Sequence, residues 1–315
     1  MQSPLAIVFA LLAAVMFGLG NALEHQVART VPANRGVSVR LLGRLARSPR
    51  WALGMLNDVG AFGFQAAALA FGGLLVVQPV LVSGLLVALA LSARWSGLRV
   101  RGSEWLSAIL LCTALATFLV EASPSGGGTH SPFLHWMVAT GPVLATIAVA
   151  VAVASRLDGR ARAALLGISA GGLFGISSSL TKTFVDQIQR GVPYTASHWE
   201  VYALAALSIV GILLTQNGFQ SGSLATSLPA LEATEPLVAA WVGITVLHER
   251  ISGRTSFDNV AIGLSIVSMI VAVIVLASEI GTRAELVERD LLLDAEPKTP
   301  DRDDLAVEPR HSERA

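Results

Sequence analysis

The chain has 315 residues, of which 53% are hydrophobic and 14% are charged, and its mean hydropathy is +0.63. A soluble domain of this composition could not stay in solution, so we expect lipid to surround most of the chain. The 22 basic and 22 acidic residues cancel, and net charge therefore gives no argument for a nucleic-acid partner. The single cysteine, Cys112, excludes an internal disulfide and any multi-cysteine metal site.

Nine apolar stretches are long enough to cross a bilayer. A helix needs about 20 apolar residues to do so, because its backbone polar groups must all be bonded within the segment. The sequence therefore predicts an all-α polytopic membrane protein. The first stretch has no basic leader and no cleavage-like site, so we expect a retained helix rather than a signal peptide. The stretches cover residues 4–24, 51–71, 74–93, 105–122, 134–154, 163–183, 200–219, 223–247 and 260–278.

Arginine accumulates in the loops after the first, third and fifth stretches. Short cytoplasmic loops retain Lys and Arg, so the N-terminus is predicted outside and the C-terminus in the cytoplasm. Arginine replaces lysine almost throughout, which is typical of GC-rich bacterial genomes and favours a bacterial plasma membrane. Residues 280–315 are charged and contain prolines, and are predicted to be a disordered cytoplasmic tail. The loop arginines are Arg29, Arg35, Arg40, Arg44, Arg47, Arg50, Arg94, Arg99, Arg101, Arg156, Arg160 and Arg162.

Segment 37–47 alternates apolar and basic residues at helical spacing. Leu41 and Leu45 fall on one face, and Arg40 and Arg44 are interleaved with them. This pattern predicts an interfacial basic helix lying on anionic lipid. A plain positively charged loop explains the same residues, and the sequence leaves both open.

Three short landmarks occur twice in the same order, at separations of 157, 155 and 157 residues. They predict a first transmembrane repeat at 1–122, a connector with the fifth helix at 123–158 and a second repeat at 159–279. Corresponding elements are five helices apart, and this odd number turns the second four-helix repeat upside down. Inverted halves suit alternating access. The landmarks are Phe17-Gly18 with Phe174-Gly175, Gly63-Phe64-Gln65 with Gly218-Phe219-Gln220, and Gln78-Pro79 with Glu235-Pro236.

Each half carries the same series of short motifs. A glycine-bearing first helix is followed by a close hairpin, then by a mid-helix proline and an arginine-bearing loop. This series resembles the drug/metabolite transporter superfamily, and its EamA-like members in particular. The hairpin is Phe71-Gly72-Gly73-Leu74, and the second half is most similar in Leu231-Glu232-Ala233-Thr234-Glu235-Pro236-Leu237 and His248-Glu249-Arg250-Ile251-Ser252.

The resemblance covers about residues 5–278 and has one clear departure. EamA-like members have ten helices, whereas this chain lacks the second helix of each repeat and gains a connector. The segment leading into Ser48-Pro49-Arg50-Trp51, with residues 66–81, is similar to the nine-span NIPA-type magnesium transporter branch. The resemblance implies a secondary transporter that moves a small solute across the membrane and uses no cofactor.

Two carboxylates lie near the centre of the eighth predicted span. Glu232 and Glu235 are three residues apart, so they share a helix face. Ionisable groups inside a bilayer usually mark a pathway for a solute or ion. Two acids this close and without a countercharge would not both ionise, so one of them would keep a proton. A proton-linked switch needs such a proton. One protonated structural carboxyl, or an ion pair with Lys182, is the alternative. Pro229 and Pro236 are predicted to break this helix.

A second polar group lies on the second predicted span. Asp58 and Gln65 share a face at seven-residue spacing, and Asn57 adjoins them. Asp58 is a candidate for the pathway, whereas a hydrogen bond between helices explains the two amides equally well. Gln78, beside the predicted helix-breaking Pro79, completes the candidates of the first half.

The sixth predicted span is rich in glycine and hydroxyl residues. Either the helix breaks there, with Ser178 lining the path of the solute, or the glycines only permit close packing. Lys182 lies near the outer end, where it lines the pathway or extends its ammonium group to the membrane surface. Asn217, with Gln216 and Gln220, forms a further polar group near the end of the seventh span.

The sequence does not favour an enzyme. Gly175-Ile176-Ser177-Ser178-Ser179 lacks the closing glycine of a nucleophile elbow, and His248-Glu249 has no second histidine. The other histidines, His25 among them, fall where a solvated side chain is expected.

We therefore predict a carrier of an amphipathic compound or metabolite, with membrane lipid and the solute as partners and a homodimer left open. A carrier of magnesium or another divalent cation, with Glu232 and Glu235 as ligands, is the first alternative. A non-transporting, lipid-binding scaffold is the second.

Overall fold

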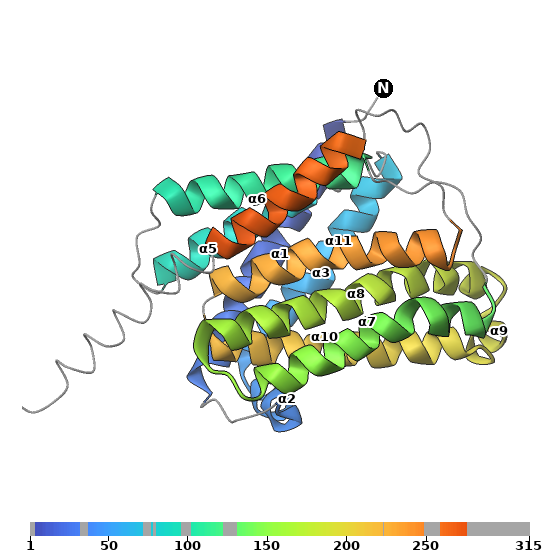
Figure 1. Ribbon diagram of the computed structural model, residues 1–315. Coiled ribbons are helices and arrows are strands. Elements are labelled where there is room, and N and C mark those ends of the chain that lie inside the picture. Colours follow the sequence, from blue (N-terminus) through green and yellow to red (C-terminus); the bar gives the residue numbers. More distant parts are fainter. Residues whose placement is uncertain are drawn as a thin grey trace, which may run out of the picture. The chain divides into compact units, whose positions relative to one another are not determined.

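The computed structural model describes residues 4–31, 37–71, 77, 80–95, 102–121, 131–222, 224–248 and 259–275 (Figure 1). These residues form helices joined by short turns, with no strand among them, as the sequence predicts. All of them belong to one compact unit that ends at Gly281. The helices are α1 (Pro4–Thr30), α2 (Val39–Leu45), α3 (Pro49–Phe71), α5 (Gly84–Trp95), α6 (Gly102–Glu121), α7 (Phe133–Ala154), α8 (Gly159–Gln189), α9 (Val192–Ala196), α10 (Trp199–Ser221), α11 (Leu224–Thr245) and an unlabelled helix, Asn259–Val275.

Four helices, α1, α7, α8 and α10, are long and apolar enough to cross a membrane. Three shorter apolar helices, Val80–Trp95, Trp105–Glu121 and Asn259–Val275, accompany them. Each predicted apolar stretch overlaps a helix of the structure. The class predicted from composition, a helical membrane protein, therefore agrees with the structure.

One bundle is built around α8, whose apolar span is 72% buried, against 28% for α10. Gly167, Gly171 and Gly175 follow one another along the face of α8 that meets α11. A Cβ atom on Gly171 would lie 2.5 Å from the Leu231 carbonyl oxygen, and one on Gly175 would lie 2.6 Å from the Glu235 carbonyl oxygen. The two backbones thus touch along parallel helices, as small residues at four-residue spacing allow.

A second bundle, built around α1, repeats this arrangement. A Cβ atom on Gly18 of α1 would lie 2.6 Å from the Gly84 carbonyl oxygen of α5, and Ala14 touches Gly84 one turn earlier, so α1 and α5 run parallel. The other neighbour of each central helix is antiparallel: α3 packs on α1, and α10 packs on α8. The same three-helix geometry therefore occurs in α1, α3 and α5 and in α8, α10 and α11.

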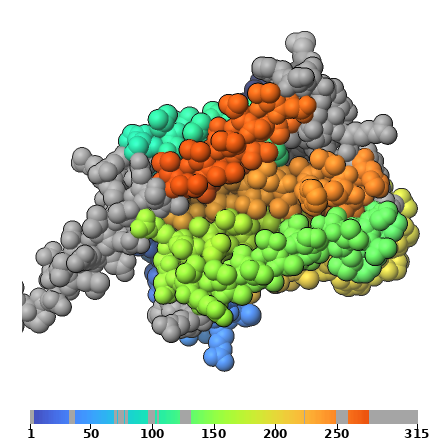
Figure 2. Space-filling view, in the orientation of Figure 1, coloured from blue at the N-terminus to red at the C-terminus, as the bar shows by residue number. Residues whose placement is uncertain are grey.

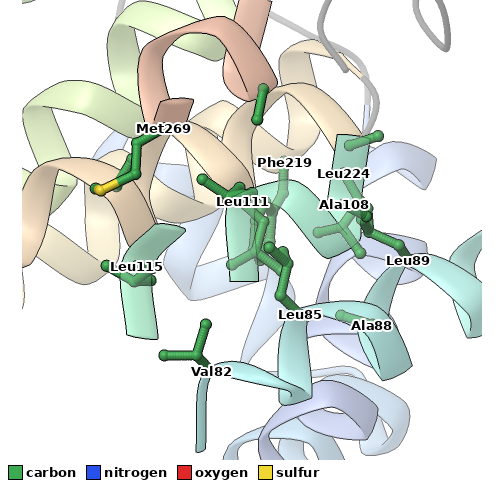
Figure 3. Close-up of a cluster of buried hydrophobic side chains, with 14 of the residues drawn as sticks. Val82, Leu85, Ala88, Leu89, Ala108, Leu111, Leu115, Phe219, Leu224 and Met269 are labelled. Carbon is green, nitrogen blue, oxygen red and sulfur yellow. The ribbon is translucent and has the colours of Figure 1, made fainter. Parts of the chain in front are cut away.

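The largest apolar core joins these bundles. It draws side chains from α1, α2, α5, α6, α10, α11 and the helix Asn259–Val275. Figure 3 shows Leu111 and Leu115 of α6 near Met269, and Phe219 and Leu224 beside Leu85 and Leu89.

Large apolar side chains are also exposed, as lipid contact requires. They are frequent on α7 and on Asn259–Val275, which both lie on the face shown in Figure 2. Leu134 and Leu264 are examples.

Segment 37–47 contains the predicted helix, but the apolar face lies elsewhere than expected. Leu41 and Leu45 of α2 are at most 2% exposed and belong to the core that joins the bundles. Arg40 and Arg44 are exposed on the other side. The prediction of an apolar face lying on lipid is therefore wrong, because these leucines bury more area against α10 and the core than a headgroup layer would offer.

The predicted breaks in α8 and α11 do not occur. α8 is continuous from Gly159 to Gln189, and its glycines serve close packing. α11 is continuous through Pro229 and Pro236. A proline removes one backbone hydrogen bond, which a membrane helix tolerates when neighbouring helices support it.

Several predictions fall outside the described residues. These concern Gln78 and Pro79, the arginines at positions 35, 99 and 101, the loop 122–130 and the tail beyond 280.

Candidate functional site

The carboxyl group of Glu235 lies at the middle of α11 and meets α8. The Ser178 hydroxyl donates a hydrogen bond of 3.2 Å to Glu235 Oε1. The contact is possible because Gly175, one turn earlier on α8, lets the backbone touch that of Glu235. The sequence predicted both residues as pathway candidates, and the structure brings them together.

Glu232 lies one turn earlier on α11 and faces a different neighbour. Its carboxyl is within electrostatic reach of Cys112 on α6 and of Glu235. Both acids are partly buried. The alternative pairing with Lys182 stays a prediction. The two carboxyls form an acid pair between α6 and α8.

A polar strip on α8 continues from this acid pair. Ser178 and Thr181 are exposed although α8 is otherwise the most buried candidate span, and Lys182 is partly buried one turn beyond Ser178. A lipid-facing surface with Ser, Thr, Lys and an adjacent Glu would be costly. The strip is better suited to contact water or a polar solute.

A second acid pair joins α1 to α3, and the sequence did not predict it as a pair. Glu24 and Asp58 lie in one contact of α1 with α3, within electrostatic reach of each other. Each acid lies against a glycine of the other helix: a Cβ on Gly20 would collide with Asp58 Oδ1, and one on Gly54 would lie 2.8 Å from Glu24 Cγ. Each glycine precedes the acid of its own helix by four residues. This reciprocal spacing of glycine and acid is the signal that could have predicted the pair.

Gln216 of α10 connects this pair to the other bundle. Its Nε2 donates a hydrogen bond to Glu24 Oε2. Glu24 is 3% and Gln216 1% exposed. Three oxygens of this cluster are buried and form no hydrogen bond with the described residues: Glu24 Oε1, Asp58 Oδ1 and Gln216 Oε1.

His25 follows Glu24 and is buried, contrary to the expectation of a solvated side chain. Its Nε2 lies 3.1 Å from the Gly222 carbonyl oxygen, and its Nδ1 lies 3.4 Å from Ser92 Oγ. The ring packs edge-on against Phe219 at 5.8 Å. The expectation failed because the apolar run ends at Glu24 whereas α1 continues to Thr30.

The remaining amide candidates make structural contacts. Asn57 Nδ2 donates to the Leu53 carbonyl of its own helix at 2.8 Å. Asn217 is buried and accepts a 3.0 Å hydrogen bond from the Ser38 backbone, so it anchors the segment before α2. Gln65 is partly buried on α3, and no contact joins it to Asp58.

Within the described part of the chain, no group of three or more His, Cys, Asp or Glu side chains could hold a metal ion. Glu232 and Glu235 therefore have no third ligand of these types among the residues described.

Comparison with known proteins places the chain in a family. No family model matches it. No solved structure matches it either. An uncharacterized protein of Corynebacterium glutamicum is 35% identical over 284 residues, which cover 88% of this chain and 96% of that protein.

The chain belongs to the family of this corynebacterial protein. The aligned 284 residues are too many to fit into either bundle alone, so the shared length includes helices of both bundles. Membership of this corynebacterial family therefore concerns both bundles.

Proposed function

We propose that the chain is a secondary transporter of the drug/metabolite type, which moves a small solute across the plasma membrane by alternating access. The observation that carries the proposal is the contact between Glu235 and Ser178. A carboxyl at the middle of an apolar helix, next to an exposed polar strip, is expensive in a membrane and is typical of a solute or ion pathway.

The repeated three-helix geometry supports alternating access. α1 and α8 each lie between one antiparallel and one parallel neighbour. The C-terminal ends of α1 and α10 lie together, because Glu24 contacts Gln216 and His25 contacts Gly222. α8, in contrast, runs antiparallel to α10. This is the arrangement expected of inverted halves, and we propose nine spans with the N-terminus outside and the C-terminus in the cytoplasm.

An organic solute fits the acid pair of α11 better than a bare divalent ion. Hard divalent cations prefer several oxygen ligands. The pair faces two different helices, and it adjoins a thiol, a hydroxyl and a long apolar wall. We therefore propose an amphipathic compound or metabolite as the solute, with proton exchange at Glu232 and Glu235.

The test is flux through purified protein in liposomes. A panel of amphipathic cations, neutral metabolites and Mg²⁺ is offered with and without a pH gradient. Proton-dependent flux of an organic solute, lost in Glu235→Gln, is the expected result. Glu200→Gln is the matched control, because Glu200 is also a buried acid but lies in the first turn of α10, which packs near the end of α11, at Val242 and Val246, and not at its middle.

Two outcomes would contradict the proposal. Uptake of Mg²⁺ alone, lost in Glu235→Gln, would make the protein a divalent carrier. Absence of flux for every member of the panel, with Glu232→Gln and Glu235→Gln as stable as the wild type, would indicate a scaffold.

A further inference from the structure

The second acid pair, Glu24 with Asp58, has features that helix packing alone does not require. Two helices that need close contact can achieve it with glycine and alanine, as α8 and α11 do. α1 and α3 instead use Gly20 and Gly54 to make room for two carboxyl groups. The pair is therefore a built feature of this contact.

Two carboxyl groups set into one buried helix contact call for a proton or a positive charge between them. A proton held by one of them lets it donate a hydrogen bond to the other. Two carboxylates in contact in a low-dielectric site do not both ionise, and they titrate as a pair. Gln216 is the neighbour that donates a hydrogen bond to Glu24. A shared proton satisfies both groups.

The charged and titratable groups around the pair are few. On α1 they are His25 and Arg29, and His25 is directed to Gly222 and Ser92. α3 contributes Asp58 itself and, at its start, Arg50. α5 ends with Arg94 in its last turn. The end of α10 presents only the amides Gln216, Asn217 and Gln220.

A proton is favoured over a metal ion by the third group in the cluster. Gln216 directs its amide N–H to Glu24 Oε2, and a donor at that position would repel a metal. The described residues also contain no group of three metal-binding side chains. A proton needs only one oxygen from each carboxyl group.

We propose that Glu24 and Asp58 form a proton-binding site, separate from the acid pair of α11, whose charge state sets the contact of α10 with α1 through Gln216. The inference rests on the proposed transport function, because it gives the carrier a coupling site at the junction of its two bundles. Loss of the proton leaves a negative charge on Glu24, which strengthens the hydrogen bond from Gln216. It also leaves two like charges that repel each other across the contact of α1 with α3. Gln216 is a positioning residue in this arrangement.

Infrared spectroscopy tests the site without any solute. Wild-type protein in lipid is titrated with base, and the protonated-carboxyl stretching band is followed together with proton release. The band should disappear with release of about one proton per molecule from the pair. Glu24→Gln and Asp58→Asn should each abolish this step, and Glu200→Gln should leave it unchanged.

A second measurement applies if a variant fails to fold. Labelling the aspartate carboxyls of the wild-type protein with ¹³C should shift the band if Asp58 carries or shares the proton. Labelling the glutamate carboxyls tests Glu24 in the same way. A titration unchanged in both variants, or by both labels, overturns the proposal. Loss of the band on addition of Na⁺ or Mg²⁺ at constant pH also overturns it, because a metal ion would then be the natural occupant.

The outcome is independent of the search for a solute. A band that titrates as expected in a protein without flux would preserve the proton site and contradict the transporter. Proton-driven flux that survives in Glu24→Gln and Asp58→Asn would preserve the transporter and remove the coupling role of this pair.

Discussion

The two three-helix bundles share their geometry and differ in what fills the contacts. In the bundle of α8, α10 and α11, backbone meets backbone along Gly167, Gly171 and Gly175. In the bundle of α1, α3 and α5, one such contact remains, at Gly18 and Gly84, and the other neighbour, α3, meets α1 through acids set against glycines.

The positions of the acids differ as well. Gly18 touches Gly84 and Val87, whereas Gly175 touches Glu235 and Val238. In the packing, Gly84 therefore takes the place that Glu235 has in the other bundle. The acids of the first bundle, Glu24 and Asp58, lie instead at the interface of α1 with α3. We infer that the α8 bundle provides a rigid solute wall and that the α1 bundle provides a contact that can change with charge.

The largest effect expected from this comparison is that of Gly171→Ala. The new Cβ would meet the Leu231 backbone, which cannot move without shifting α11. We expect a loss of about 2 kcal/mol in the free energy of unfolding, measured by reversible unfolding in bicelles. The same substitution at Gly20 meets the end of the Asp58 side chain, which can rotate away, and approaches the Gly54 carbonyl oxygen less closely, at 3.1 Å, so it should cost less, about 1 kcal/mol.

Gly141→Ala is the control for both, since open space surrounds Gly141 on α7. It should be neutral or slightly stabilising, because alanine favours a helix over glycine by about 1 kcal/mol. Equal losses at Gly171 and Gly20 would show that the two bundles do not differ in rigidity.

A smaller effect is expected where the bundles join. Gln216→Leu keeps the size of the side chain and removes the donor to Glu24 Oε2. Hydrogen bonds between membrane helices contribute about 0.6 kcal/mol on average. A buried acceptor left without its donor adds a further cost. We therefore expect the free energy of unfolding to fall by about 1 kcal/mol. The measurement is again reversible unfolding, at a pH where the acid pair is protonated and at one where it is not.

Gln65→Leu is the matched control, because Gln65 lies on α3 outside the cluster. A loss in Gln216→Leu that does not change with pH would show that the link between the bundles is insensitive to the acid pair.

The sequence predicted the helices and one acid pair for clear physical reasons. Glu232 and Glu235 interrupt a long apolar run, and such an interruption is visible without a structure. Glu24 escaped because it stands where the run ends, so hydropathy assigned it to a loop although α1 continues for another turn and a half. Its partner Asp58 was found, but a pairing between two helices depends on their rotation, which a single sequence does not give.

The arrangement of α2 and the prolines was also beyond the sequence. An amphipathic basic helix has the same pattern whether its apolar face meets lipid or protein, and only the packing of Leu41 against the core decides. Pro229 and Pro236 signal a break in a soluble helix, whereas membrane helices tolerate them when neighbours support the backbone.

The smallest effect is expected at Ser178, an exposed residue of α8. Ser178→Ala removes the hydroxyl that donates to Glu235 and alters little else, since the side chain is exposed. A surface substitution of this kind should change the free energy of unfolding by less than about 0.5 kcal/mol. Flux should nevertheless fall by about fivefold, because a hydrogen bond to the acid is worth about 1 kcal/mol.

Thr146→Ala on α7 is the control, because Thr146 is also exposed and its hydroxyl is bonded to the Pro142 carbonyl of its own helix at 2.9 Å. It should leave flux close to that of the wild type. If Ser178→Ala lowered stability and flux together, the contact with Glu235 would hold the helices together and would not serve flux alone. Ser178 could then not be used to distinguish the rigid α8 bundle from the charge-dependent contact of α1 with α3.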